Sequence, residues 1–437
     1  MICLVSLPFK VNLVSPLSLA ILKALIPEYD SVCVDLSPEF NQCFMRWVLK
    51  DKIEELHEET YRRDFYPVEL LLKGEGDSEL YSICHSMADR ILSYDPKVVC
   101  FSVQLGNIGT SLTVGKILKD EGIKVIFGGS AFLWKSKIYA RMFPWIDCVV
   151  EGEAEPVFRS LIHKVIKGYK VQRFIISPML LDLNESPIPD YGDLNLDNYQ
   201  LIGIETQRGC VNRCSFCNNR FSQLYEVYRE KKVERVKREL EILKEYNKPF
   251  YFCDNITNPN RKRLISLCKA IAPLGIKWMG EFLPRISFQE AYWLWKSGCF
   301  SVTLGVESLC DRTLRKMEKP ITVRDILNSI EALSMFGIDI QVNLIIGYPR
   351  ESLLDFLQTV VRLFRVENKV KRFLFSEFVV PQKSKIYNNP DKYGVKLLSK
   401  CENSIFSRAF QLKSEWERRK QKFLLIFMEL LFNRESL

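Results

Sequence analysis

Residues 208–217 read Arg208-Gly209-Cys210-Val211-Asn212-Arg213-Cys214-Ser215-Phe216-Cys217, which spaces three cysteines as C-x3-C-x2-C. Three thiolates leave a four-iron cluster one ligand short, so one iron stays open to a substrate or cofactor. The preceding run Leu201-Ile202-Gly203-Ile204 is apolar and favours a strand. The stretch therefore predicts a reactive iron–sulfur cluster on a loop at the C-terminal end of a strand.

A zinc knuckle is the alternative interpretation of the same cysteines. The fourth zinc ligand would then come from Cys253 or from a histidine. A cysteine spacing is a weak signal by itself and becomes a strong one when the following strands fit the same family. The strands after residue 217 do fit, as described below, and they favour the cluster.

Length and composition indicate a globular protein of two or three domains. The chain has 437 residues, 47% of them hydrophobic, which is enough for packed cores. The net charge of +9 comes from 62 basic and 53 acidic residues and is only mildly basic. The densest basic stretch, 229–238, has acids interleaved at helical spacing, which is more typical of a solvated helix face than of a nucleic-acid site.

The sequence favours a reducing compartment. No apolar run reaches the length of a membrane span, and residues 1–8 lack the basic region of a secretory signal. Fourteen cysteines are scattered without a disulfide-like framework. We therefore expect a cytoplasmic protein.

The first 165 residues alternate short apolar runs with helical patterns, which is an α/β signature. The runs lack polar alternation, so they predict a parallel sheet covered on both faces in a doubly wound, Rossmann-like domain. The predicted strands are 2–7, 31–36, 98–103, 124–127 and 148–150. Ligands of such domains lie beyond the strand C-termini, where Gly128-Gly129-Ser130 and Glu151-Gly152-Glu153 follow two strands. The glycines either let a bulky ligand come close to the backbone or form tight turns.

A proline-containing linker over 166–200 leads into a second domain. From 201 to 390 a strand-then-helix pattern repeats about six times and predicts a partial (β/α)6 barrel of the TIM type. Strand ends with polar residues are expected at 251–256, 277–281, 301–308 and 342–349. Residues 391–437 are predicted to be helical, with an amphipathic helix over 406–432 that docks on the barrel or on a partner.

The cysteine run resembles the cluster loop of radical S-adenosylmethionine (SAM) enzymes. The N-terminal half is similar to the cobalamin-binding-type domain that precedes many radical SAM cores, through Ser15-Pro16-Leu17-Ser18-Leu19-Ala20, 125–129 and 149–153. Domains that ligate cobalt through histidine carry D-x-H-x-x-G, and none of the three histidines, His57, His85 and His163, has that context. Cobalamin is therefore expected either to bind without a histidine ligand or to have been lost.

The resemblance implies the roles of individual residues. In the family, the Gly-Val-Glu-Ser element lies against the adenosine ribose and the Gly-x-Pro element shapes the adenine pocket. Glu281 and Arg285 are expected either at the aminoacyl end of SAM or as a salt bridge at the rim. The expected cluster ligands are Cys210, Cys214 and Cys217; the expected SAM contacts are Phe216, Glu281, Glu307, Ser308, Gly347 and Pro349; the expected cobalamin contacts are Gly128, Gly129, Ser130, Glu151 and Gly152.

The resemblance also implies the reaction. An electron from flavodoxin, ferredoxin or an artificial reductant would drive reductive cleavage of SAM, followed by hydrogen abstraction from an unactivated C–H. Bound cobalamin would make the outcome a methylation, whereas its absence would favour epimerisation, rearrangement or crosslinking. The elements Asp254-Asn255-Ile256, 305–309 and 317–319 are most similar to enzymes that mature ribosomal peptides, although the loop is compact and Leu304 replaces the usual proline.

Other functions stay open at this stage. One is a radical SAM enzyme acting on tRNA or a small metabolite; no RNA-binding appendage is visible in the sequence. Another is an inactive radical SAM fold that serves as a scaffold or binding protein, which the intact three-cysteine run argues against.

Overall fold

The computed structural model describes residues 1–8, 13–50, 78–217, 227–381, 383–397, 410–412, 424, 427–428 and 432. These residues form two compact units that divide between Ile202 and Gly203. None of the cysteines in the described part of the chain forms a disulfide. No helix among the described residues is long and apolar enough to cross a membrane.

The first unit is built on a six-stranded parallel sheet with the strand order β2-β1-β3-β4-β5-β6. This is the flavodoxin-like version of the doubly wound fold, in which β1 and β3 flank the switch point where ligands bind. The predicted Rossmann-like fold is therefore confirmed. Its strands are β1 (Ile2–Ser6), β2 (Ser31–Asp35), β3 (Val98–Ser102), β4 (Lys124–Gly128), β5 (Cys148–Glu151) and β6 (Phe174–Ile176).

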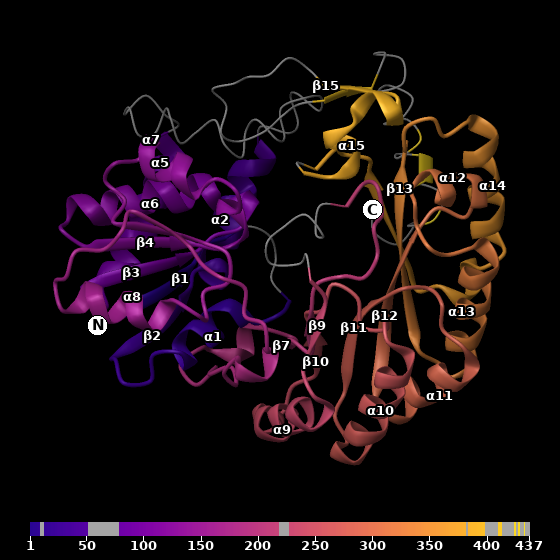
Figure 1. Ribbon diagram of the computed structural model, residues 1–437, viewed down its shortest axis with the longest axis horizontal. Helices are drawn as coiled ribbons and strands as arrows, with labels where there is room; N and C mark the ends of the chain where they lie inside the picture. The colour runs from indigo at the N-terminus through magenta and orange to yellow at the C-terminus, as the bar shows by residue number, and fades with distance from the viewer. Residues whose placement is uncertain are drawn as a thin grey trace. The chain divides into compact units, whose positions relative to one another are not determined.

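Helices cover both faces of this sheet (Figure 1). One face packs in a single core with α2 (Ser37–Lys50), α5 (Ser78–Leu92), α6 (Ile108–Asp120) and α7 (Ser136–Met142). The other face packs with α1 (Leu17–Ala24) and α8 (Phe158–Ile166). Because both faces are buried, the central strands are apolar without alternation, which is the pattern that made them recognisable.

The second unit is a parallel six-stranded sheet in the order β7-β10-β11-β12-β13-β14, curved into the predicted partial barrel (Figure 1). All four predicted strand ends coincide with observed strands. The strands are β7 (Ile202–Ile204), β10 (Phe250–Phe252), β11 (Trp278–Phe282), β12 (Cys299–Glu307), β13 (Asp339–Ile346) and β14 (Arg372–Glu377).

The barrel helices start at well-defined caps. Capping boxes formed by Ser287 and Glu290, Thr322 and Asp325, and Ser352 and Asp355 open α11 (Phe288–Lys296), α13 (Val323–Met335) and α14 (Leu353–Phe364). Each box satisfies backbone N–H groups that have no partner inside the helix. The remaining barrel helices are α9 (Val233–Leu243), α10 (Arg261–Ile271) and α12 (Asp311–Lys316).

The chain beyond the barrel differs in part from the expected helical region. After α15 (Lys385–Asn388), β15 (Val395–Leu397) pairs antiparallel with β16 (Phe410–Leu412), so a strand lies where the amphipathic helix was predicted to begin. Residues 424, 427, 428 and 432 are helical, as predicted. The ring of Phe432 packs 4.8 Å from that of Phe364 and 5.3 Å from that of Phe373, which places this end of the helix on the barrel.

The predicted linker begins too early. β6 lies inside the predicted range 166–200 and pairs in parallel with β5, so this part of the range belongs to the first sheet. The strand has three residues, none of them fully buried. Its residues, Phe174, Ile175 and Ile176, are all apolar, but an apolar run of three is too short to distinguish an edge strand from an extended linker.

Candidate functional site

The three-cysteine loop starts from a short antiparallel ladder between β8 (Gln207–Arg208) and β9 (Arg229–Glu230). Gly209 has a φ of +92°, and a Cβ at this position would lie 2.6 Å from the carbonyl oxygen of Val227. Only glycine combines this conformation with such a close backbone approach. Gly209 therefore lets the ladder close directly before Cys210.

Asp254 fixes the base of the loop. Its carboxylate accepts hydrogen bonds from the Thr206 amide at 2.8 Å, the Thr206 hydroxyl at 2.7 Å and the Gln207 amide at 3.1 Å. Burial raises the pKa of Asp254 to about 6, although these three hydrogen bonds oppose the shift. Asp254 thus holds the junction between β7 and the loop.

The three thiols lie on one loop and differ in burial. Cys214 is 9% exposed, while Cys210 and Cys217 are half-buried. Burial raises the pKa of the Cys214 thiol to about 12; the Lys319 ammonium opposes this rise, and the charges of Cys217 and Cys210 add to it. A bound cluster would supply the positive charge that deprotonates such a thiol, so the donor set fits a cluster held by three thiolates.

A zinc knuckle would need a fourth ligand from Cys253 or from a histidine. Within the ranges that the structure describes, no three His, Cys, Asp or Glu side chains are placed to hold a single ion. Cys253, the proposed fourth ligand, lies after β10, and its thiol is directed to the Tyr251 carbonyl oxygen at 3.7 Å.

Glu307 and Lys319 form a nearly buried ion pair beside the loop. The Lys319 ammonium donates to Glu307 Oε1 at 2.9 Å, and the two side chains are 7% and 13% exposed. Glu307 has a φ of +65° at a register shift between β12 and β13, which turns its side chain at the strand end. Lys319 Nζ also lies 5.9 Å from the centre of the Phe216 ring, so the predicted Phe216 and Glu307 do come together.

Glu281 lies on the neighbouring strand and is bonded to Tyr251. The Tyr251 hydroxyl donates to Glu281 Oε1 at 3.2 Å. Burial raises the pKa of Glu281 to about 7; the Tyr251 hydrogen bond opposes this shift, and the charge of Glu307 adds to it. Arg285 is exposed, and no ion pair joins it to Glu281 in the described part of the chain. The rim salt bridge considered for this pair is therefore absent.

Of the remaining predicted SAM contacts, Gly347 and Pro349 lie together after β13, whereas the Ser308 side chain is turned away from Glu307. Gly347 has a φ of +79° directly after β13 and is half-buried, and Pro349 is buried behind it. Ser308 instead points away from Glu307, because its hydroxyl lies 3.2 Å from that of Thr359 on α14 and accepts from the Cys310 amide at 3.2 Å. Ser308 therefore ties the end of β12 to the helix layer.

The first unit places Gly128, Gly129 and Ser130 at the carboxyl edge of its sheet, as predicted. Gly129 has a φ of +106°, and a Cβ there would lie 2.6 Å from the Val103 amide nitrogen. The amide of Val103 also donates to the Gly128 carbonyl at 2.8 Å. The space that a side chain at position 129 would fill is therefore occupied by the backbone of Val103.

The Glu151 side chain forms hydrogen bonds within the first unit. Its carboxylate is 5% exposed and accepts from the Trp134 amide at 2.8 Å and the Ser136 amide at 3.2 Å, which caps α7. Glu153 similarly accepts from the Leu180 amide at 2.6 Å. Gly152, with a φ of +102°, makes the turn between them. These contacts favour a structural role for Glu151 over the predicted cobalamin contact.

The described histidines do not lie at this edge. His163, near the end of α8, bonds the Tyr29 hydroxyl at 2.9 Å. Tyr29 immediately precedes β2, so this pair lies at the amino edge of the parallel sheet. His85 lies within α5 against Tyr81. His57 is outside the described residues.

Sequence reasoning missed four residues of the site: Ser215, Tyr251, Lys319 and Tyr348. Lys319 belongs to the Met317-Glu318-Lys319 element, which carries part of the family resemblance, but the sequence assigns no role to its side chain. The Ser215 and Tyr348 hydroxyls lie 2.7 Å apart although 133 positions separate them in the chain. No local pattern predicts such a tertiary hydrogen bond.

Comparison with known proteins agrees with this geometry. Residues 204–363 match the family model of the Radical SAM superfamily, a family that implies a [4Fe–4S] cluster and SAM. An uncharacterized methyltransferase of Pyrococcus horikoshii is 30% identical over 292 residues, which cover 61% of this chain and 63% of that protein. TokK, a cobalamin-dependent radical SAM methyltransferase of Streptomyces tokunonensis, is 25% identical over 38% of this chain and 28% of its own length. The chain thus spans less than two thirds of either relative.

A solved structure shows the same two-unit fold. The radical SAM methyltransferase TsrM from Kitasatospora setae, solved with cobalamin and a [4Fe–4S] cluster bound, superimposes with a TM-score of 0.63. The match covers 92% of this chain and 81% of that one at 16% sequence identity. At this identity the similarity shows the fold: a Rossmann-like unit followed in the chain by a partial (β/α) barrel.

Proposed function

We propose that this protein is a cobalamin-dependent radical SAM methyltransferase. The observation that carries the proposal is that the loop bearing Cys210, Cys214 and Cys217 lies beside the Lys319–Glu307 ion pair, with Lys319 Nζ 5.9 Å from the centre of the Phe216 ring. When bound, the cluster and cobalamin supply the electron transfer, the SAM cleavage and the methyl group. The protein then contributes three thiolate ligands, a carboxylate for the ribose hydroxyls and a glycine edge for the adenine.

Each proposed contact has a physical basis. Glu307 can accept hydrogen bonds from two ribose hydroxyls, because only one of its oxygens is bonded to Lys319. Gly347 has no side chain, so a flat base can approach its backbone. Phe216 offers a ring face beside them. In the first unit, Gly128, Ser130 and Gly152 form the edge proposed for cobalamin. Gly129 and Glu151 are left out, because they already contact Val103 and the amides of Trp134 and Ser136.

The substrate class is a finer proposal. The elements that suggested peptide maturation include Asp254 and the 317–319 turn, and both of these hold the cluster loop. Their presence therefore follows from the cluster site and does not discriminate between substrates. We keep a peptide as the proposed substrate, with a small metabolite or tRNA as the alternative. The proposed setting is the cytoplasm with a flavodoxin or ferredoxin as electron donor.

The activity is tested by anaerobic turnover with methyl-labelled SAM and a chemical reductant. Reconstituted protein should consume SAM, and the Cys210→Ala/Cys214→Ala/Cys217→Ala variant should not. Glu307→Gln should weaken SAM binding by about an order of magnitude, the loss expected for one charge-assisted hydrogen bond, while Glu367→Gln on the surface should not. SAM affinity unchanged in Glu307→Gln by calorimetry would remove Glu307 from the pocket.

Cobalamin dependence is tested separately by its absorption spectrum. Protein reconstituted with cobalamin should retain it, and the spectrum should be the same in His57→Ala, His85→Ala and His163→Ala. A nitrogen-ligated spectrum that disappears in one variant would contradict binding without histidine. Failure to retain cobalamin would instead favour epimerisation, rearrangement or crosslinking.

A further inference from the structure

Ser215, between two of the cluster cysteines, uses its amide, its carbonyl and its hydroxyl to bond other parts of the second unit. Its amide donates to the Met317 carbonyl at 2.9 Å, and its carbonyl accepts from the Ile386 amide at 3.2 Å. Its hydroxyl lies 2.7 Å from the Tyr348 hydroxyl. Since Ser215 is completely buried, these bonds do not compete with water.

Tyr348 joins this serine to the turn that follows α12. The Tyr348 hydroxyl donates to the Lys316 carbonyl at 2.9 Å, and the residue is 3% exposed. Its ring packs edge-on against Phe378 at 5.3 Å. Tyr348 and Met317 belong to one buried hydrophobic cluster, against which Phe216 also packs. The cysteine loop is therefore supported by residues that lie far from it in the sequence, Met317, Tyr348 and Phe378.

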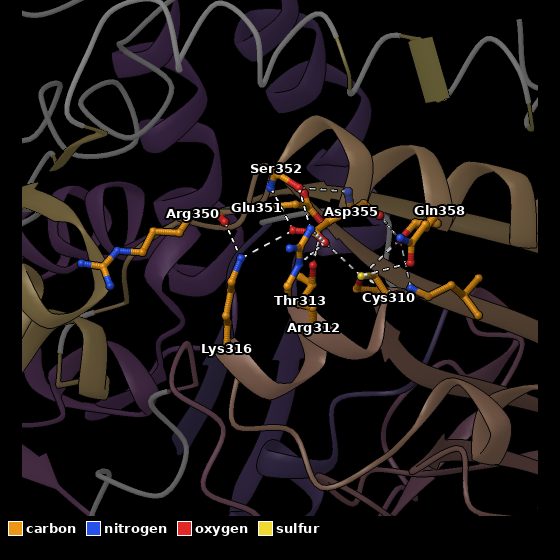
Figure 2. Close-up of polar contacts among 12 residues, drawn as sticks. Cys310, Arg312, Thr313, Lys316, Arg350, Glu351, Ser352, Asp355 and Gln358 are labelled. Carbon is orange, nitrogen blue, oxygen red and sulfur yellow. Dashed lines mark hydrogen bonds and ion pairs between the residues drawn. The ribbon is translucent and has the colours of Figure 1, made fainter.

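The turn Lys316–Lys319 is itself fixed on two sides. Figure 2 shows the Lys316 ammonium between the Arg350 carbonyl, at 2.6 Å, and Asp355 Oδ2, at 3.5 Å. Asp355 is buried and also accepts from Arg312 Nε at 2.6 Å. This network joins α12 to the start of α14.

Residues that follow the barrel also hold the turn Lys316–Lys319. Glu318 accepts from the Tyr393 hydroxyl at 2.6 Å and from the Lys385 ammonium. Lys385 is the residue before Ile386, whose amide bonds the Ser215 carbonyl. The chain after the barrel thus reaches both the turn and the cluster loop.

We propose that Tyr348 is a positioning residue that holds the three-cysteine loop, through Ser215 and the Lys316–Lys319 turn, in the conformation that binds the cluster. The proposal rests on the proposed function, because it assumes that this loop binds a cluster. Tyr348 acts through the serine next to Cys214.

Tyr348→Phe tests the proposal, because it removes one hydroxyl and keeps the packing of the ring. Tyr199→Phe is the matched control: Tyr199 is also 3% exposed, and its hydroxyl donates to Asp35 Oδ2 at 2.7 Å in the other unit. The first readout uses protein without a cluster and follows alkylation of Cys214 by iodoacetamide with mass spectrometry. The second follows the rate at which a chelator bleaches the reconstituted cluster.

Both rates should rise at least fivefold in Tyr348→Phe and stay at the wild-type value in Tyr199→Phe, because the lost hydroxyl bonds both Ser215 and Lys316 and each bond is worth about 1 kcal/mol. Ser215→Ala should have a smaller effect, and the double variant should add little to Tyr348→Phe, because both changes remove the Ser215–Tyr348 bond. Wild-type rates in Tyr348→Phe, or an equal rise in Tyr199→Phe, would overturn the proposal. A wild-type protein that builds no cluster would instead refute the proposed function.

Discussion

The Lys319 ammonium lies 2.9 Å from Glu307 Oε1, and this ion pair stands between the cluster loop and the barrel strand that ends at Glu307. Both side chains are mostly withdrawn from water. Removing one partner from such a pair leaves a buried charge without compensation, whereas removing both does not.

This relationship predicts a strong coupling in stability. Glu307→Gln and Lys319→Met should each lower the free energy of unfolding by about 3 kcal/mol, and the double variant should lose much less than the sum. Denaturant unfolding of the four proteins of the cycle measures the coupling. The exposed pair Lys371–Asp339 is the control and should show a coupling below about 1 kcal/mol. If the stability losses of Glu307→Gln and Lys319→Met simply add in the double variant, the ion pair is not formed in solution.

Gly209→Ala should prevent cluster binding. The added methyl group would need a left-handed conformation and would meet the Val227 carbonyl, so the β8–β9 ladder could not close. Gly275→Ala is the matched control, because Gly275 has a φ of +65° with nothing within 4 Å of a Cβ. The control should lose about 1 kcal/mol of stability and keep its iron. An iron content as high in Gly209→Ala as in the control would contradict this role.

Glu281 should make stability depend on pH near neutrality. The unfolded chain releases this proton near pH 4.5, whereas the folded protein holds it to about pH 7. The stabilising contribution is therefore complete below pH 4.5 and is lost as the pH rises through 7, by about 3 kcal/mol in total. Glu281→Gln stays neutral, so its stability relative to wild type should increase between pH 5 and pH 8. Denaturant unfolding at both pH values checks this, and a constant difference would contradict the shift.

The sequence predicted the strands well because most of them are buried on both faces. β1 and β3 appear as unbroken apolar runs, and the polar residue at the end of β12 marks the barrel mouth. β6 is also apolar but has only three residues, which is too short a run to separate a strand from the predicted linker. β16 was missed because its pairing with β15 depends on contacts outside its own segment.

The candidate site was predicted only where residue type alone carries the chemistry. Three spaced thiols are a chemical signature, so Cys210, Cys214 and Cys217 could be recognised without a structure. Ser308 was grouped with Glu307 by adjacency, yet a left-handed turn at Glu307 sends the two side chains apart. Tyr348 and Lys319 act through tertiary contacts, which only the fold reveals.

The central claim is that Cys210, Cys214 and Cys217 hold a four-iron cluster with one open iron. The most direct test is iron analysis and electron paramagnetic resonance of the anaerobically reconstituted protein, before and after adding SAM. The account predicts about four iron atoms per chain, a reduced-cluster signal that changes when SAM is added, and no cluster in the triple alanine variant. Stoichiometric zinc with no cluster absorption, in protein purified without oxygen, would contradict it.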